Sequence, residues 1–303
     1  MAHIPDGFLS PPVIAGTAAL SAAALAVATR RSARQLDDRQ APVLGALTAF
    51  VFAAQMLNFP LGAGTSAHLL GGVLLAVIAG PWAGMLALFS VVLVQALLFQ
   101  DGGIAALGAN TLNLAVVGVG GGYLLYRWQL ALLGDGPRGR LIAAGVAAFL
   151  VTVLTGVAAG LQLGISGVVP LRTAVAAVGI AHLPVGVVEA ALTVGILAAV
   201  LRSRPELAPH RAPSARGRTL AIIGTLAVGA AAAAAAWASE RPDALESAAA
   251  RLGLHDPGAS FAPLADYGAP VGGAWTAAAA GLVAVFAVAW GLVRLAIRGS
   301  PTA

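Results

Sequence analysis

The chain has 303 residues, of which 59% are hydrophobic and only 10% carry a charged side chain. Ordinary soluble domains contain about 45–50% apolar and about 25% charged residues, so these few charges cannot cover a soluble protein of this length. The mean hydropathy is +0.90, and the composition predicts an all-α integral membrane protein. Cysteine is absent, which excludes disulfides, thiolate metal sites and cysteine nucleophiles.

The apolar segments predict about nine membrane-spanning helices, since one crossing needs about 20 mostly apolar residues. The runs lie near residues 11–29, 41–59, 66–80, 82–99, 104–126, 141–163, 173–201, 219–237 and 274–297. We expect a seven-helix bundle followed by a two-helix C-terminal module. The two runs around Pro81 are short and closely joined, so a hairpin or a partly re-entrant pair is an alternative there.

The chain divides into three regions by composition. Residues 1–201 form the predicted bundle, residues 202–218 form a linker rich in Arg and Pro, and residues 219–303 form the two-span module. Within the module, the segment 238–273 joins the two spans. Its middle, residues 243–254, predicts a short amphipathic helix. The apolar face of that helix consists of Leu245, Ala248, Ala249 and Leu252.

The basic side chains, all of them Arg, gather in alternate loops. The segments 30–40, 127–140 and 202–218 and the C-terminal end together hold all but three of the 17 basic residues. The exceptions are Arg172, Arg241 and Arg251. Because short loops rich in Arg stay on the cytoplasmic side, we expect an external N-terminus and a cytoplasmic C-terminus in the cell membrane. The basic surplus then marks a membrane side and not a nucleic-acid surface.

His3 lies next to the chain terminus, where several nitrogen donors come together. A terminal amine, backbone amides and an imidazole can surround a square-planar ion such as Ni²⁺ or Cu²⁺. If Met1 is retained, the amine is that of Met1; if it is removed, the amine is that of Ala2. An incidental histidine at a chain end is the alternative interpretation.

His68 lies in the small-residue segment MLNFPLGAGTSAHLLGG at the predicted start of the third span. The orientation above places it on the same external side as His3. Glycines around an imidazole leave room for a second chain segment to approach it. An ionisable residue inside a span is a functional candidate, and the alternative is a histidine that packs helices and bonds to a carbonyl group.

His182 and Glu189 lie seven residues apart in the seventh predicted span and therefore share a helix face. Glu189 is the one acidic residue deep in a predicted span, where a lone carboxylate is costly. A metal or proton path and a structural hydrogen-bond network are equally compatible with this pair.

A second polar cluster interrupts the apolar sequence between residues 99 and 123. Asp101, Asn110 and Asn113 stand at an external loop and at the start of the following helix. Such side chains can orient a metal-binding imidazole from behind, or they can cap and cross-link helices.

Four motifs occur in a familiar order: HIPDGFLSP, GTSAHLLGG, FQDGGIAALGAN and AHLPVGVVEAALT. They resemble the substrate-binding M subunit of cobalt and nickel energy-coupling-factor (ECF) transporters. The later RPDALESAAARLGL resembles the small N subunit, so the resemblance covers nearly the whole chain as an M–N fusion. The chain departs from the pattern at Ala2, which moves histidine from second to third place, and at Ala244, where glycine is usual.

The resemblance implies a substrate-capture subunit for Ni²⁺ or Co²⁺, with Ni²⁺ favoured. Its metal would be held by the terminal amine of Ala2, or of Met1 where that is retained, by the amide and imidazole of His3, and by His68. The resemblance also implies that this chain binds no nucleotide and that a separate transmembrane T subunit and cytoplasmic ATPases drive transport. It implies a transporter subunit and not an enzyme.

Two other functions are compatible with parts of the sequence. A stand-alone secondary carrier or channel would use Glu189 and His182 as a proton relay. An intramembrane serine protease would use Ser166 of GISG with His68, although the serine follows the histidine here, the reverse of the order in rhomboid proteases.

Overall fold

The computed structural model describes residues 3–38, 40–61, 65–203, 217–239, 241–254, 263–264 and 273–299. In these ranges the chain is almost entirely helical, as the composition predicts. In chain order the elements, with η marking π-helical segments, are α1 (Pro11–Ala33), α2 (Ala41–Met56), β1 (Phe59–Pro60), β2 (Ser66–Ala67), α3 (Gly72–Ala79), α4 (Pro81–Val94), η2 (Gln95–Phe99), α5 (Leu107–Thr111), η3 (Leu112–Gly121), α6 (Gly122–Leu133), α7 (Pro137–Ile165), α8 (Leu171–Ser203), α9 (Gly217–Trp237), α10 (Ala244–Arg251) and α11 (Gly273–Arg298).

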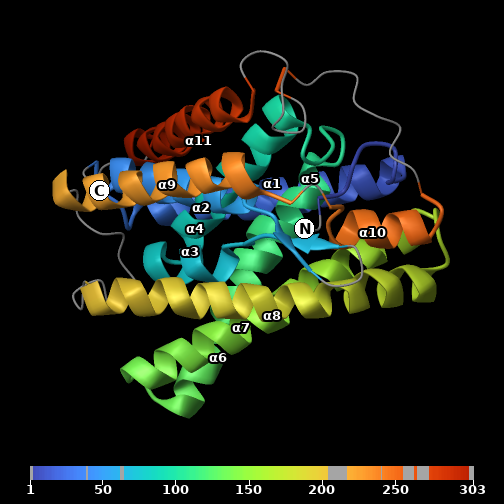
Figure 1. The fold of residues 1–303 in the computed structure, drawn as a ribbon, viewed down its shortest axis with the longest axis horizontal. Helices are drawn as coiled ribbons and strands as arrows, with labels where there is room; N and C mark the ends of the chain where they lie inside the picture. The colour runs from blue at the N-terminus through green and yellow to red at the C-terminus, as the bar shows by residue number, and fades with distance from the viewer. Residues whose placement is uncertain are drawn as a thin grey trace.

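The long helices lie roughly side by side, and the short α10 lies at one end of them (Figure 1). Among the described residues, six helices are long and apolar enough to cross a membrane. They are Pro11–Ala33, Pro81–Phe99, Pro137–Ile165, Leu171–Arg202, Thr219–Trp237 and Gly273–Arg298. The fold is therefore that of a helical multi-pass membrane protein, although the predicted number of nine spanning helices is not reproduced.

Local sequence explains where the helices begin and turn. Proline occupies the first or second position of α1, α2, α4 and α7, where its missing N–H group costs nothing. Gly80 between α3 and α4 has a φ of +82°, a conformation that glycine adopts freely and other residues rarely do. The reversal at Gly80–Pro81 explains why these two apolar runs are so closely joined.

The run 66–80 was predicted as a span, but only its second half is helical. The eight residues of α3 reach about 12 Å, less than half of a bilayer core. The preceding residues are not helical: Ser66 and Ala67 form β2 of the antiparallel β1–β2 pair, and residues 68–71 are irregular. Gly71 has a φ of +75°, and a Cβ there would lie 2.8 Å from Val51 Cγ1. Hydropathy registers the apolar side chains of this run but does not reveal that its backbone is unwound.

The predicted run 104–126 forms one helical stretch from Leu107 to Leu133, through α5, η3 and α6. The glycines of this stretch let neighbouring helices pack closely against it. A Cβ on Gly72 of α3 would lie 2.7 Å from the carbonyl oxygen of Gly118, so the two backbones approach closely only because Gly72 has no side chain.

The arginine-rich end of α1 lies beside the start of α4 and the end of α11. The Arg31 guanidinium stands 5.9 Å from the centre of the Trp82 ring. The Arg294 Nε atom lies 3.8 Å from Asp38 Oδ1. Residues 30–38 and the end of α11, which the sequence grouped on one side of the membrane, thus lie together at one end of the bundle.

Helices α9 and α11 of the C-terminal module pack against α2, and α11 also packs against α4. A Cβ on Gly45 of α2 would lie 3.0 Å from the Phe286 ring. A Cβ on Gly281 of α11 would overlap the Phe52 ring and lie 2.9 Å from Phe99 Cζ. Small residues on both sides therefore bring the module close to the bundle.

Replacing Gly281 with valine should lower the melting temperature of the detergent-solubilised protein. The branched side chain would collide with buried Phe52, and overpacking of this kind costs about 1–3 kcal/mol. The matched control is Gly291→Val on the same helix, because a Cβ on Gly291 meets nothing within 4 Å. Equal melting temperatures for the two variants would contradict the described packing of α11 on α2.

Candidate metal site

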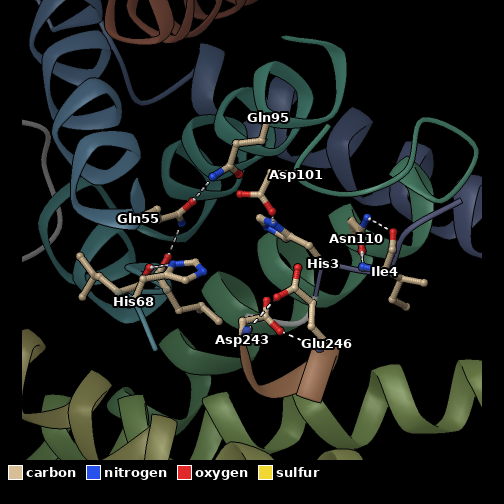
Figure 2. Close-up of polar contacts among 11 residues, drawn as sticks. His3, Ile4, Gln55, His68, Gln95, Asp101, Asn110, Asp243 and Glu246 are labelled. Atoms are coloured by element: carbon tan, nitrogen blue, oxygen red, sulfur yellow. Dashed lines mark hydrogen bonds and ion pairs between the residues drawn. The ribbon is translucent and has the colours of Figure 1, made fainter. Parts of the chain in front are cut away.

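His3 and His68 face one another across a cavity of about 500 Å³. Their side chains are almost fully buried, with 4% and 5% of the residue surface exposed. The centres of the two rings lie 6.3 Å apart, and the ring planes are inclined by 55°. Figure 2 shows His3 at the middle of a group of polar side chains and His68 at one side of it, below Gln55. The structure thus brings together the two histidines that the sequence singled out as metal ligands.

Asn110 fixes the N-terminal segment that carries His3. The Ile4 N–H group donates to Asn110 Oδ1 at 2.7 Å, and Asn110 Nδ2 donates to the Ile4 carbonyl oxygen at 3.0 Å. The Gly103 N–H group donates to that same oxygen at 2.9 Å. Both buried backbone groups of Ile4 are therefore satisfied, and the residue next to His3 is tied to α5.

Asp6 ties the same segment to the loop before α5. One carboxylate oxygen accepts the Ala105 N–H at 2.8 Å. The Ile104 and Ala106 N–H groups also donate to this carboxylate, at 3.1 and 3.2 Å. A Cβ on Gly103 would overlap Asp6. The HIPDGF and FQDGGIAALGAN motifs therefore bind each other. Their separation in the sequence did not reveal this contact.

Asp101 contacts His3 directly, as the sequence suggested for a residue that orients an imidazole. Its carboxylate oxygen Oδ1 bonds to His3 Nδ1. A tight turn presents Asp101, since Gln100 has a φ of +61°, uncommon for a residue other than glycine, and Gly102 has a φ of +95°. The other ring nitrogen of His3, Nε2, is buried and has no hydrogen-bond partner among the described residues.

The segment that carries His68 is held by side chains from two other helices. Gln55 of α2 donates from Nε2 to the Leu70 carbonyl oxygen at 2.8 Å, and its Oε1 accepts from Gln95 Nε2 at 2.9 Å. Glu189 of α8 accepts the N–H groups of Leu70 and Gly71, at 2.6 and 2.9 Å. The sequence analysis did not identify these two glutamines as site residues. The one feature that could have indicated them is that each is a polar residue near the end of an apolar run.

Helix α10 of the C-terminal module forms another wall of the cavity. It matches the predicted amphipathic helix, and Leu245, Ala248 and Ala249 are buried as expected. Asp243 and Glu246 cap each other's backbone N–H groups at 2.8 Å, and both line the cavity. Burial and then the neighbouring Asp243 raise the pKa of the Glu246 carboxyl. Figure 2 shows this pair beside His3.

The module also bonds to the hairpin that leads to His68. The Ser66 N–H donates to the Pro242 carbonyl oxygen at 2.9 Å, and the Ser66 hydroxyl donates to the Arg241 carbonyl oxygen at 2.7 Å. The Ser239 N–H donates to the Asn58 carbonyl oxygen at 2.9 Å. The C-terminal module is therefore joined to the segment that presents a candidate metal ligand.

Other predicted site residues have partners elsewhere in the bundle and do not line the cavity. Asn113 exchanges two hydrogen bonds with Gln162, at 2.9 and 2.7 Å. His182 donates from Nδ1 to the Val178 carbonyl oxygen at 2.8 Å. The Ser166 hydroxyl accepts the N–H of Ser10 at 3.0 Å. Met1 and Ala2, the predicted sources of the terminal amine, lie outside the described residues.

The cavity suits an ion that accepts nitrogen ligands. Within the described ranges, no three His, Asp or Glu side chains stand close enough to form a metal-binding group by themselves. Two imidazoles supply only part of a coordination sphere, so further donors have to come from other groups. Imidazole favours ions such as Ni²⁺, Cu²⁺ and Zn²⁺ over Mg²⁺ or Ca²⁺.

The fold and the site define a helical membrane protein with two facing buried imidazoles, a ligand type that suits transition-metal ions. Residues 3–207 match the family model described as the cobalt uptake substrate-specific transmembrane region. The chain belongs to this family, and it is a component of a metal transporter and not an enzyme.

Relatives extend the likeness to nearly the whole chain. The putative fused nickel transport protein NikMN of Archaeoglobus fulgidus is 35% identical over 97% of this chain and 99% of its own length. The fused nickel transport protein NikMN of Rhodobacter capsulatus is 36% identical over 86% of this chain and 82% of its own. These two proteins confirm the predicted fusion of an M-type and an N-type subunit.

Solved structures match about two thirds of the chain. A crystal structure of a transition metal transporter is 32% identical, with a TM-score of 0.61, over 67% of this chain and 94% of its own. A truncated transition metal transporter is 33% identical, with a TM-score of 0.60, over 66% of this chain and 99% of its own. The bundle therefore has the fold of a known type of metal transporter.

Replacing Asn110 with alanine should release the N-terminal segment. Both hydrogen bonds to Ile4 are lost, and each contributes about 0.5–1.5 kcal/mol. Amide hydrogen exchange of residues 3–9 should then become faster than in the unmodified protein. The control is Asn113→Ala, which removes an equally buried amide that bonds to Gln162. Exchange that is equally fast in both variants would contradict the specific role of Asn110.

Proposed function

We propose that this chain captures a divalent transition-metal ion as the first step of ATP-driven import by an ECF-type transporter. Ni²⁺ is favoured over Co²⁺ as the substrate. The observation that carries the proposal is the pair of buried imidazoles, His3 and His68, with ring centres 6.3 Å apart on the wall of one cavity. The remaining donors in the proposal are the amide of His3 and the terminal amine, of Ala2 if Met1 is removed and of Met1 otherwise.

Coordination chemistry supports the preference for Ni²⁺ over Co²⁺. An amine, an amide and two imidazoles make an all-nitrogen set, which suits a square-planar ion such as Ni²⁺. Co²⁺ stands below Ni²⁺ in the Irving–Williams order and forms weaker complexes with the same donors. Two fused relatives are named as nickel transport proteins, whereas more distant ones are named as cobalt transport proteins.

The proposal assigns a role to each region of the chain. Residues 1–201 bind the metal, residues 202–218 are a cytoplasmic linker, and residues 219–303 are the N-type module with an external segment at 238–273. The N-terminus faces outward, in keeping with the Arg-rich loops. Energy comes from a separate T subunit and cytoplasmic ATPases, since the chain has no G-x-x-x-x-G-K-[ST] sequence.

His3→Ala and His68→Ala should each abolish high-affinity Ni²⁺ binding while the protein still inserts and folds. Loss of a direct ligand should raise the dissociation constant for Ni²⁺. The increase should exceed the roughly 10–100-fold that follows loss of a residue hydrogen-bonded to a ligand. Isothermal titration of the purified protein measures this change. Acetylation of the α-amine should have the same effect.

The control for these variants is His182→Asn, because asparagine can still donate to the Val178 carbonyl oxygen and the position lies away from the cavity. It should bind Ni²⁺ like the unmodified protein. If both His3→Ala and His68→Ala bind Ni²⁺ as tightly as the unmodified protein, the assignment of these residues as ligands is wrong.

Lipid vesicles that contain this chain alone should accumulate no Ni²⁺. Vesicles that also contain the T subunit and the ATPases should accumulate it when ATP is supplied on the cytoplasmic side. The rival function, a stand-alone carrier driven through Glu189 and His182, predicts uptake by the chain alone. In the structure both residues bond to protein backbone and neither lines the cavity, so they offer this rival no support.

A further inference from the structure

We propose that Glu189 is a positioning residue, which holds His68 at the cavity by binding the unwound backbone just after it. The inference rests on the proposed metal site, because its purpose is to explain how one of the two imidazoles is kept in place. Glu189 itself does not line the cavity. It acts through the segment of residues 66–71.

The unwound segment needs partners that the helix cannot supply. The first N–H groups of a helix have no acceptor inside it, and the N–H groups of residues just before the helix find none there either. Within a membrane, irregular backbone persists only where it is buried in protein or lines a water-filled cavity. Leu70 and Gly71 do not line the cavity, so protein groups have to satisfy their N–H groups. The N–H groups of Leu70 and Gly71 stand in this position, directly before α3.

Glu189 satisfies both of these groups with one side chain. Its Oε2 accepts the Leu70 N–H at 2.6 Å, and its Oε1 accepts the Gly71 N–H at 2.9 Å. Only 1% of Glu189 is exposed, so water does not compete for these bonds. An ionised carboxylate accepts at both oxygens and donates at neither, which fits two adjacent N–H groups.

Glutamine in place of Glu189 would keep the size and shape of the side chain but would no longer offer two acceptors to the two N–H groups. Its amide has one accepting oxygen and one NH₂ group, and that NH₂ group would face an N–H donor. One backbone donor would lose its partner and the segment would loosen. Glu189→Gln therefore tests the hydrogen bonding of Glu189 while the volume of the side chain stays nearly unchanged.

Gln55 holds the same segment from the opposite side and offers an independent variant. Its Nε2 donates to the Leu70 carbonyl oxygen at 2.8 Å, so Leu70 is tied to α2 by its carbonyl group and to α8 by its N–H group. Gln55→Leu removes the first tie and leaves Glu189 in place. Both variants should loosen the same few residues.

The experiment combines amide hydrogen exchange with Ni²⁺ titration on the full-length protein in lipid nanodiscs. Without metal, Glu189→Gln should speed the exchange of residues 66–72 by roughly 2–10-fold, as expected for one net hydrogen bond. With Ni²⁺ added, its affinity should fall by about 10–100-fold, the cost of losing an outer partner of a ligand. Gln55→Leu should speed the same exchange.

The matched control is Thr193→Val, one turn further along α8. Thr193 is as buried as Glu189 and its hydroxyl has no hydrogen-bond partner among the described residues. This variant tests whether any change to the buried face of α8 disturbs the site. It should leave both the exchange of residues 66–72 and the Ni²⁺ affinity unchanged.

The proposal is overturned if Glu189→Gln leaves either quantity at the value of the unmodified protein. It is also overturned if exchange rises equally throughout α7 and α8, which would show a general packing role. If the unmodified protein binds no Ni²⁺, the proposed function fails separately. The metal-free exchange of residues 66–72 then decides alone whether Glu189 holds the segment.

Discussion

The structure depends on one constraint: backbone that is not helical inside a membrane must find its hydrogen bonds in the protein. Residues 66–71 interrupt the predicted third span, and the side chains that bind them come from two other helices. Glu189 on α8 and Gln55 on α2 bind Leu70 from two sides, and Gln95 on η2 supports Gln55. The polar side chains buried in these otherwise apolar helices are explained by the segment that they hold.

Buried polar side chains also hold a second irregular segment, residues 3–8, which precedes the first span. Asn110 forms hydrogen bonds with both the N–H and the carbonyl group of Ile4. In turn, Asp6 accepts hydrogen bonds from N–H groups of the loop before α5. Two non-helical segments, each pinned by buried polar side chains, therefore meet at the cavity. Their meeting places His3 opposite His68.

Much of this arrangement could be predicted from the sequence, because it depends on apolar runs and residue types. Composition indicated the helical membrane class, and the apolar periodicity of residues 243–254 predicted α10. The unwound segment could not be predicted, because hydropathy measures side chains and not backbone hydrogen bonds. Asn110 and Asn113 look equivalent in the sequence, yet they lie on either side of the change from α- to π-helical winding and contact different partners.

The fused module adds a third segment to the same cavity. The Pro-Asp-x-x-Glu sequence at residues 242–246 is a capping box, so its two acids have a structural role in starting α10. Backbone groups just before that box bond to Ser66, two residues from His68. Fusion in one chain keeps this contact at a high effective concentration. The module is therefore bonded directly to the hairpin that leads to His68, and it supplies one wall of the cavity.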